Sequence, residues 1–234
     1  MWKLACVDYA FPLLSFDQAL DLIALLEFDA VDIGLFAGSS HIDPSEVLSD
    51  IPKSSRELLE KLDGRGLSMA DLFLTPGQDF FTLAPNHPDP GERQQSREFP
   101  LKSLDLSIRV GARHVTVLLG AVFPDESRDD SRKRCSDELA WRSEQAGKAG
   151  LPFGIEPHIG SVVDPPARTL GLIEITPGLT LALDAAHFVC EGTSQSELES
   201  LLPHTSHLHA RCSAKDKLQA SFQNNTIGLA GLLK

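Results

Sequence analysis

Three side chains that commonly bind divalent cations, Glu156, Asp184 and His209, each lie at or near the end of a short apolar run. The runs are about one strand-plus-helix period apart, and in a parallel barrel the carboxyl ends of such strands meet at one mouth. Two carboxylates and an imidazole suit a divalent cation and leave coordination positions for water or sugar hydroxyls. The competing interpretation is that both acids only cap the helices that follow. Their recurrence on successive strands favours a metal site.

Three basic side chains are candidates for contact with a substrate. His158 lies two residues beyond Glu156, and His187 lies three beyond Asp184, so we expect both at the rim of the cavity. An imidazole there can hydrogen-bond a hydroxyl or a carbonyl, and a packed or surface histidine is the alternative for each. Arg211 lies two residues after His209, so the two side chains are expected on the same face of the strand. Its guanidinium can hold a phosphate, a carboxylate or Glu156 itself.

Two acids near the start of the chain are expected to point into the barrel. Asp32 and Asp8 lie within apolar runs, where an unpaired carboxylate is costly to bury. We expect them beneath a substrate or paired with Arg211, with a hydrogen bond to a neighbouring backbone amide as the alternative. His207 shares a strand face with His209, because side chains alternate along a strand, and it is a candidate for supporting the metal-binding residues.

Strand-like and helix-like patterns alternate along the whole chain, which predicts an α/β fold with a parallel sheet and right-handed crossovers. We predict strands at 4–9, 30–35, 67–74, 114–120, 153–158, 179–184 and 204–211, and helices at 15–26, 43–62, 92–110, 131–148, 165–175, 194–202 and from 226 onward. Pro100 should end or kink the third of these helices. The proline-rich segment 75–91 is expected to be a loop that covers the barrel mouth.

Seven strand-helix periods are one fewer than a closed TIM-type barrel contains. We therefore predict a single barrel domain over 1–234 that is incomplete after strand seven. The edges of strands one and seven would then be unpaired, and self-association into a homo-oligomer would cover them.

The composition narrows the classes of partner. The 234-residue chain carries a net charge of −12, which repels nucleic acid and anionic membrane surfaces. No apolar run approaches the roughly 20 residues of a membrane-spanning helix. The four cysteines are scattered without a paired-thiol motif, which indicates a reduced, cytoplasmic protein. No nucleophile-elbow or glycine-rich phosphate-loop motif occurs, which argues against a hydrolase of that type or a nucleotide-binding protein.

Several segments resemble motifs of the xylose isomerase-like TIM barrel superfamily, within the group of sugar phosphate isomerases and epimerases. They are residues 155–161, 183–188 and 207–211, supported by 84–90, 138–142 and 218–222. The resemblance implies a divalent ion, Mn, Mg, Co or Zn, held by Glu156, Asp184, His209 and a further glutamate at the end of strand eight. That glutamate has no counterpart in this chain. Asn224 and Gly228 stand where related sequences tend to carry acidic residues.

From the resemblance and the site we expect a metal-dependent isomerase or epimerase that acts on a small sugar or a related keto-polyol. Glu156 would move a proton at the carbon beside the carbonyl. One alternative is a truncated, catalytically weak barrel that binds a ligand or a partner protein. Another is a relative of the apurinic-site endonucleases. The endonuclease hypothesis needs further metal ligands, such as an Asp-x-His motif after strand seven, and residues 213–217 do not supply one.

Overall fold

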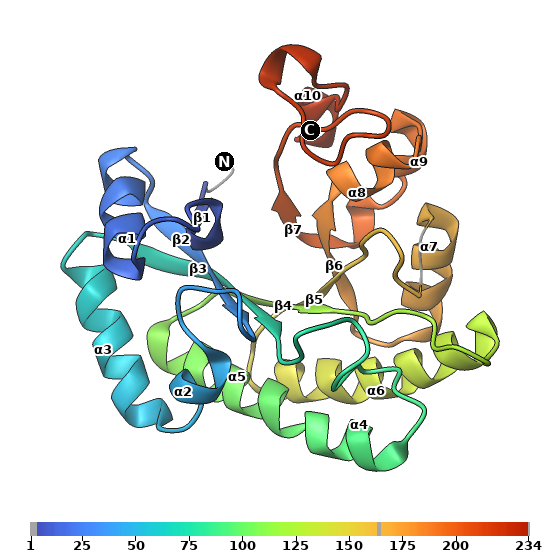
Figure 1. The fold of residues 1–234 in the computed structure, drawn as a ribbon, viewed down its shortest axis with the longest axis horizontal. Helices are drawn as coiled ribbons and strands as arrows, with labels where there is room; N and C mark the ends of the chain where they lie inside the picture. Colours follow the sequence, from blue (N-terminus) through green and yellow to red (C-terminus); the bar gives the residue numbers. More distant parts are fainter. Residues whose placement is uncertain (1–3, 163–164, 234) are drawn as a thin grey trace.

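The protein is described by a computed structural model that covers residues 4–162 and 165–233. Seven parallel strands form one sheet in chain order, and the sheet curls so that β1 and β7 face each other across a gap (Figure 1). The strands are β1 (Cys6–Val7), β2 (Ala30–Phe36), β3 (Ser68–Thr75), β4 (His114–Leu118), β5 (Phe153–Glu156), β6 (Thr180–Asp184) and β7 (Thr205–His209). No eighth strand occurs within the described ranges, so the sheet is an open, TIM-type α/β barrel.

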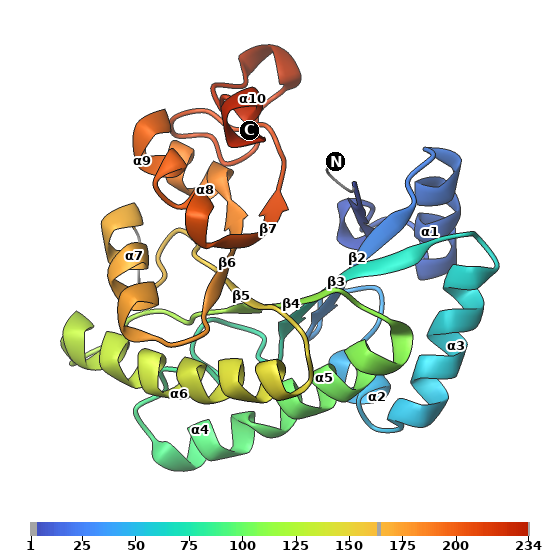
Figure 2. The same cartoon turned by 180° about the vertical axis from the view of Figure 1, so that it is seen from behind.

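Helices line the convex side of the curved sheet, as the opposite view shows (Figure 2). The longer ones are α1 (Phe16–Leu25), α3 (Ile51–Asp63), α5 (Glu98–Val110), α6 (Arg128–Lys148) and α7 (Pro166–Ile175). The shorter ones are α2 (Pro44–Val47), α4 (Pro90–Ser96), α8 (Ala185–Cys190), α9 (Gln195–Glu199) and α10 (Leu229–Leu232), with 3-10 turns η1 (Asp8–Ala10), η2 (Leu202–His204) and η3 (Phe222–Asn224). Local signals set several starts: Ser15 and Gln18 form a capping box at the start of α1.

The predicted strands and helices correspond in order to these elements, with several differences. The helix predicted at 43–62 is two helices, α2 and α3, and α8 was not predicted. The first strand is only two residues long, because the chain turns into η1 at Asp8. The predicted helix at 92–110 is two helices that meet at Arg97, and Pro100 lies in the first turn of the second, where a missing N–H costs no helical hydrogen bond. The helix predicted from 226 is the four-residue α10, and the last residue of that prediction, 234, lies outside the described residues.

The two faces of the sheet have opposite character. Along β2, Val31, Ile33 and Leu35 are fully buried in the core cluster beneath the helices. Asp32 alternates with them and is buried on the inner face, because strand side chains point to opposite sides. Parallel register places Asp32 beside Asp71 of β3, and Asp71 beside His114 of β4. The inside of the barrel is therefore lined with ionisable groups.

A glycine makes room for this polar interior. A Cβ added to Gly154 of β5 would lie 2.7 Å from Cε1 of His114 and 2.9 Å from the backbone nitrogen of Ala182. Those distances are shorter than van der Waals contact, so only glycine lets the imidazole lie against the strand.

Candidate active site

The three predicted metal-binding side chains are brought together by the fold. Glu156, Asp184 and His209 are the last residues of β5, β6 and β7, which are neighbours in the sheet. Each offers one ligand atom, and these atoms lie within 4.8 Å of one another. Asp184 also caps α8, since its Oδ1 accepts a hydrogen bond from the Ala186 backbone amide at 2.9 Å. Asp184 therefore both caps α8 and belongs to the metal-binding group, and its Oδ2 faces the site.

Glu156 and His209 form a short ion pair at the centre of this group. His209 Nδ1 lies 2.6 Å from Glu156 Oε2, and both side chains are largely buried. Burial raises the pKa of Glu156, but hydrogen bonds from His187 and His209 outweigh burial and lower it to about 2. Burial lowers the pKa of His209, but the hydrogen bond to Glu156 and nearby carboxylates raise it to about 9. Without a cation, the pair is thus charged on both sides at neutral pH.

Arg211 binds the second carboxylate of the site. Its Nη2 lies 2.7 Å from Asp184 Oδ2 and 3.2 Å from His187 Nε2. His187 in turn lies 3.4 Å from Glu156 Oε1, so it bridges the two acids. The expected pairing of Arg211 with Asp32 or Asp8 is wrong, because Arg211 follows the end of β7 and lies beside Asp184, the last residue of the neighbouring β6.

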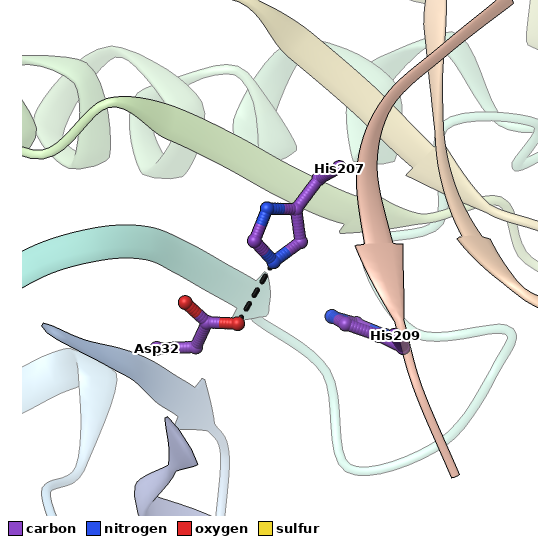
Figure 3. Close-up of side chains that lie close together, drawn as sticks. All are labelled: Asp32, His207 and His209. Carbon is purple, nitrogen blue, oxygen red and sulfur yellow. Dashed lines mark hydrogen bonds and ion pairs between the residues drawn. The ribbon is translucent and has the colours of Figure 1, made fainter. Parts of the chain in front are cut away.

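The inward direction expected for Asp32 is confirmed, but its partner is His207 and not Arg211, whereas Asp8 is buried in η1 after the end of β1. Asp32 Oδ2 lies 2.8 Å from His207 Nε2, across the barrel from β2 to β7 (Figure 3). Burial lowers the pKa of His207, but its contact with Asp32 raises it above the usual value. Asp8 accepts a hydrogen bond from the Gly34 amide at 2.9 Å and pairs with His41 at 2.9 Å. The backbone-amide alternative is therefore correct for Asp8.

A further ion pair in the interior was not predicted. His114 Nδ1 lies 2.7 Å from Asp71 Oδ1, and its Nε2 lies 2.7 Å from Ser206 Oγ. The His114 ring stacks on His207 with ring centres 5.2 Å apart. Burial raises the pKa of Asp71, but the hydrogen bond to His114 outweighs it and lowers the pKa. Alternation with the buried Leu72 and Leu74 would have turned Asp71 inward, and only the register of β3 and β4 shows its partner.

His158 and His187 lie at the rim, as expected, and line a cavity of about 300 Å³ together with residues that include Phe188, Glu191 and Thr193. The loop between β3 and α4 reaches this rim. Phe80 from that loop stacks on His158 with ring centres 4.2 Å apart. This contact confirms that the loop lies over the carboxyl ends of the strands, and it adds Phe80 to the residues beside the site.

Comparison with known proteins identifies the fold family. The family model described as xylose isomerase-like TIM barrel matches residues 20–229. No curated protein matched the sequence. In the described part of the chain, no helix is both long and apolar enough to cross a membrane.

Solved structures of similar shape share little sequence with this chain. A D-tagatose 3-epimerase-like protein superposes with a TM-score of 0.77 at 18% identity, covering 99% of this chain and 85% of that one. The IOLI protein with a bound zinc atom gives a TM-score of 0.74 at 15% identity, covering 99% and 83%. D-psicose 3-epimerase in the presence of D-fructose gives 0.72 at 13% identity, covering 90% and 73%. The family match, which spans most of the sequence, and this shared architecture show that the chain belongs to the xylose isomerase-like TIM barrel family.

Proposed function

We propose that this protein is a divalent-metal-dependent isomerase or epimerase of a small sugar or a related keto-polyol. The observation that carries the proposal is the meeting of Glu156, Asp184 and His209 at the carboxyl ends of three adjacent strands, with donor atoms within 4.8 Å of one another. In barrels of this kind, chemistry is located at that end of the sheet. The adjoining cavity of about 300 Å³ is large enough for a small sugar.

The residues fit a divalent ion chemically. Two carboxylate oxygens and an imidazole nitrogen are suitable for Mn²⁺, Mg²⁺, Co²⁺ or Zn²⁺, with imidazole favouring the transition metals. The site carries two acids, and Arg211 is a cation that pairs with one of them. A bound ion would supply Lewis acidity, polarising a carbonyl oxygen of the substrate.

The side chains around the metal group have roles that follow from their contacts. We propose Glu156 as the carboxylate that takes a proton from the carbon beside a carbonyl. It is ionised at neutral pH, because hydrogen bonds from His187 and His209 lower its pKa to about 2. His187 and Arg211 hold the two carboxylates in place and can donate hydrogen bonds to substrate oxygens. His158, stacked on Phe80, offers an imidazole at the cavity rim. Asp32 lies beneath these groups and orients His207.

The partner we propose is a small carbohydrate-like molecule. Two of the structural relatives are a D-tagatose 3-epimerase-like protein and a D-psicose 3-epimerase studied with D-fructose, and a third holds zinc. The net charge of −12 supports a small neutral substrate over nucleic acid or an anionic membrane. All four cysteines are free, which supports a reducing compartment such as the cytoplasm.

The test combines metal content with turnover. Purified protein is loaded with Mn²⁺, its metal content is measured by mass spectrometry, and interconversion of a panel of ketohexoses and keto-polyols is followed by chromatography. We expect stoichiometric metal and turnover in the wild type. Asp184→Asn should lose both, and Glu156→Gln should lose turnover. Glu144→Gln, on an exposed turn of α6, is the control for loss of an acid. An active Glu156→Gln variant would refute the assignment.

A second candidate function is a barrel that binds a ligand or a partner chain with little turnover. The observation that favours it is that, across the described residues, β1 pairs only with β2 and β7 only with β6. A homo-oligomer or another chain would cover these edges. Metal-loaded protein that binds a ketohexose in calorimetry without converting it, and sediments as an oligomer, would support this candidate.

A further inference from the structure

A second group of potential metal ligands lies inside the barrel. Asp32, His207 and His209 offer ligand atoms within 4.8 Å of one another (Figure 3). His207 lies two residues before His209 on β7, in register with Ala182, whereas His209 is in register with Asp184 at the strand end. This group is therefore one step deeper in the barrel than the group of Glu156 and Asp184, and His209 belongs to both.

Two buried atoms of this group have no hydrogen-bond partner in the part of the chain that the structure describes. Asp32 is 3% exposed, and its Oδ1 is unpaired although Oδ2 binds His207. His209 Nδ1 binds Glu156, which leaves the buried Nε2 unpaired. Figure 3 shows a ring nitrogen of His209 directed toward the Asp32–His207 pair. Buried polar atoms are normally satisfied, so two in one cluster point to a missing ligand.

Another buried Asp–His pair in the same molecule has no unpaired polar atoms. Asp8 uses both carboxylate oxygens, one for the Gly34 amide and one for His41. His41 uses both ring nitrogens, the second for the Phe11 carbonyl at 3.1 Å. Every polar side-chain atom of Asp8 and His41 therefore has a partner. The pair of Asp32 and His207, in contrast, lies beside the unpaired Nε2 of His209.

We propose that Asp32, His207 and His209 hold a second divalent transition-metal ion, deeper in the barrel than the first. One carboxylate and two imidazoles form a ligand set suited to Zn²⁺, Co²⁺ or Fe²⁺ and poorly suited to Mg²⁺ or Ca²⁺, which prefer oxygen ligands. The ring of His209 lies between the two groups, with Nδ1 toward Glu156 and Nε2 toward Asp32. With both sites filled, His209 would link two ions as an imidazolate, having released the protons of both ring nitrogens to solvent.

The second ion requires the ion pair of Asp32 and His207 to open slightly. Their atoms are 2.8 Å apart, while two ligands of one tetrahedral ion with bonds of about 2.0 Å are roughly 3.3 Å apart. Small side-chain rotations accommodate that difference. The alternative is that the pair is only a structural salt bridge, which would hold no ion.

The test is a Co²⁺ titration of protein stripped with EDTA, read by visible absorption and by metal analysis after gel filtration. We expect two ions per chain in the wild type, and one in Asp32→Asn, in His207→Gln and in Asp184→Asn, with different spectra for the two remaining sites. Asp8→Asn is the matched control, because it breaks a buried Asp–His pair outside both groups, and it should keep two ions. Near-UV circular dichroism checks that each variant is folded.

The outcomes separate this inference from the proposed function. A single ion that is lost in Asp184→Asn but kept in folded Asp32→Asn and His207→Gln overturns the second site and leaves the first. A single ion with the reverse pattern supports the inner site and overturns the proposed metal site at the strand ends. Wild-type protein without bound Co²⁺ overturns both.

Discussion

The charged pair of Glu156 and His209 makes a quantitative prediction for the metal-free protein. In Glu156→Gln the carboxylate is replaced by a neutral amide of the same shape, which mimics the protonated acid. His209 then loses the partner at 2.6 Å that keeps it charged. We expect the variant to be less stable than the wild type in the presence of EDTA.

The pKa values of both partners give the same magnitude. The pKa of Glu156 falls from 4.5 to about 2, and that of His209 rises from 6.5 to about 9. At about 1.4 kcal/mol for each tenfold change in acidity, either difference corresponds to about 3 kcal/mol. Both values contain the contact between Glu156 and His209, so they are not added. Substitution should therefore lower the free energy of unfolding by about 3 kcal/mol near neutral pH.

The pH dependence has a defined sign. The contribution of Glu156 is present above its unfolded pKa of 4.5 and is lost as the pH falls toward 2. The contribution of His209 is fully present below 6.5 and is lost as the pH rises through about 9. The difference between wild type and variant should be largest from pH 4.5 to 6.5 and should shrink above pH 9.

Urea unfolding in EDTA at about pH 5.5, 7 and 9.5 measures this difference directly. Glu144→Gln, which removes an exposed acid on α6, should change stability by less than about 0.5 kcal/mol at every pH. A difference for Glu156→Gln that is below about 0.5 kcal/mol at pH 5.5, or that does not vary with pH, would refute the reasoning.

Three further predictions concern a glycine of the sheet, a buried thiol and the metal site. Gly154→Ala should destabilise the fold by about 1 to 3 kcal/mol, because the new Cβ would lie 2.7 Å from His114. Gly147→Ala, whose new Cβ meets no atom within 4 Å, should stabilise the fold by about 0.5 to 1 kcal/mol. Urea unfolding of both variants measures the two effects. Cys135 should not react with a thiol reagent in the native protein at about pH 8, because burial raises its pKa to about 12; the Cys135→Ser variant should give the same native thiol count. Mn²⁺ affinity should rise from pH 7 to about 9 with release of about one proton, because His209 must lose its proton to bind the ion; calorimetry in two buffers measures the proton release.

The sequence patterns located the strand ends and therefore the metal-binding group at those ends. Glu156, Asp184 and His209 could be placed together because parallel strands share one carboxyl edge, and that rule needs no knowledge of register. The partner of Arg211 could not be found in this way. It depends on how β6 and β7 align, and their register shifts between Leu181 and Ala182. Such irregularities leave no clear mark in the apolar pattern of a single strand.

The inner pair of Asp32 and His207 shows a second limit of local patterns. Alternation correctly turned both side chains inward, but they come from β2 and β7, which are not neighbours in the sheet. Their contact at 2.8 Å depends on how tightly the open sheet curls, which is a property of the whole barrel. The same curvature brings the Nε2 side of His209 toward Asp32 while its Nδ1 binds Glu156. The positive charge of this one imidazole is favoured by carboxylates from both sides of the barrel, Glu156 and Asp184 on one side and Asp71 on the other.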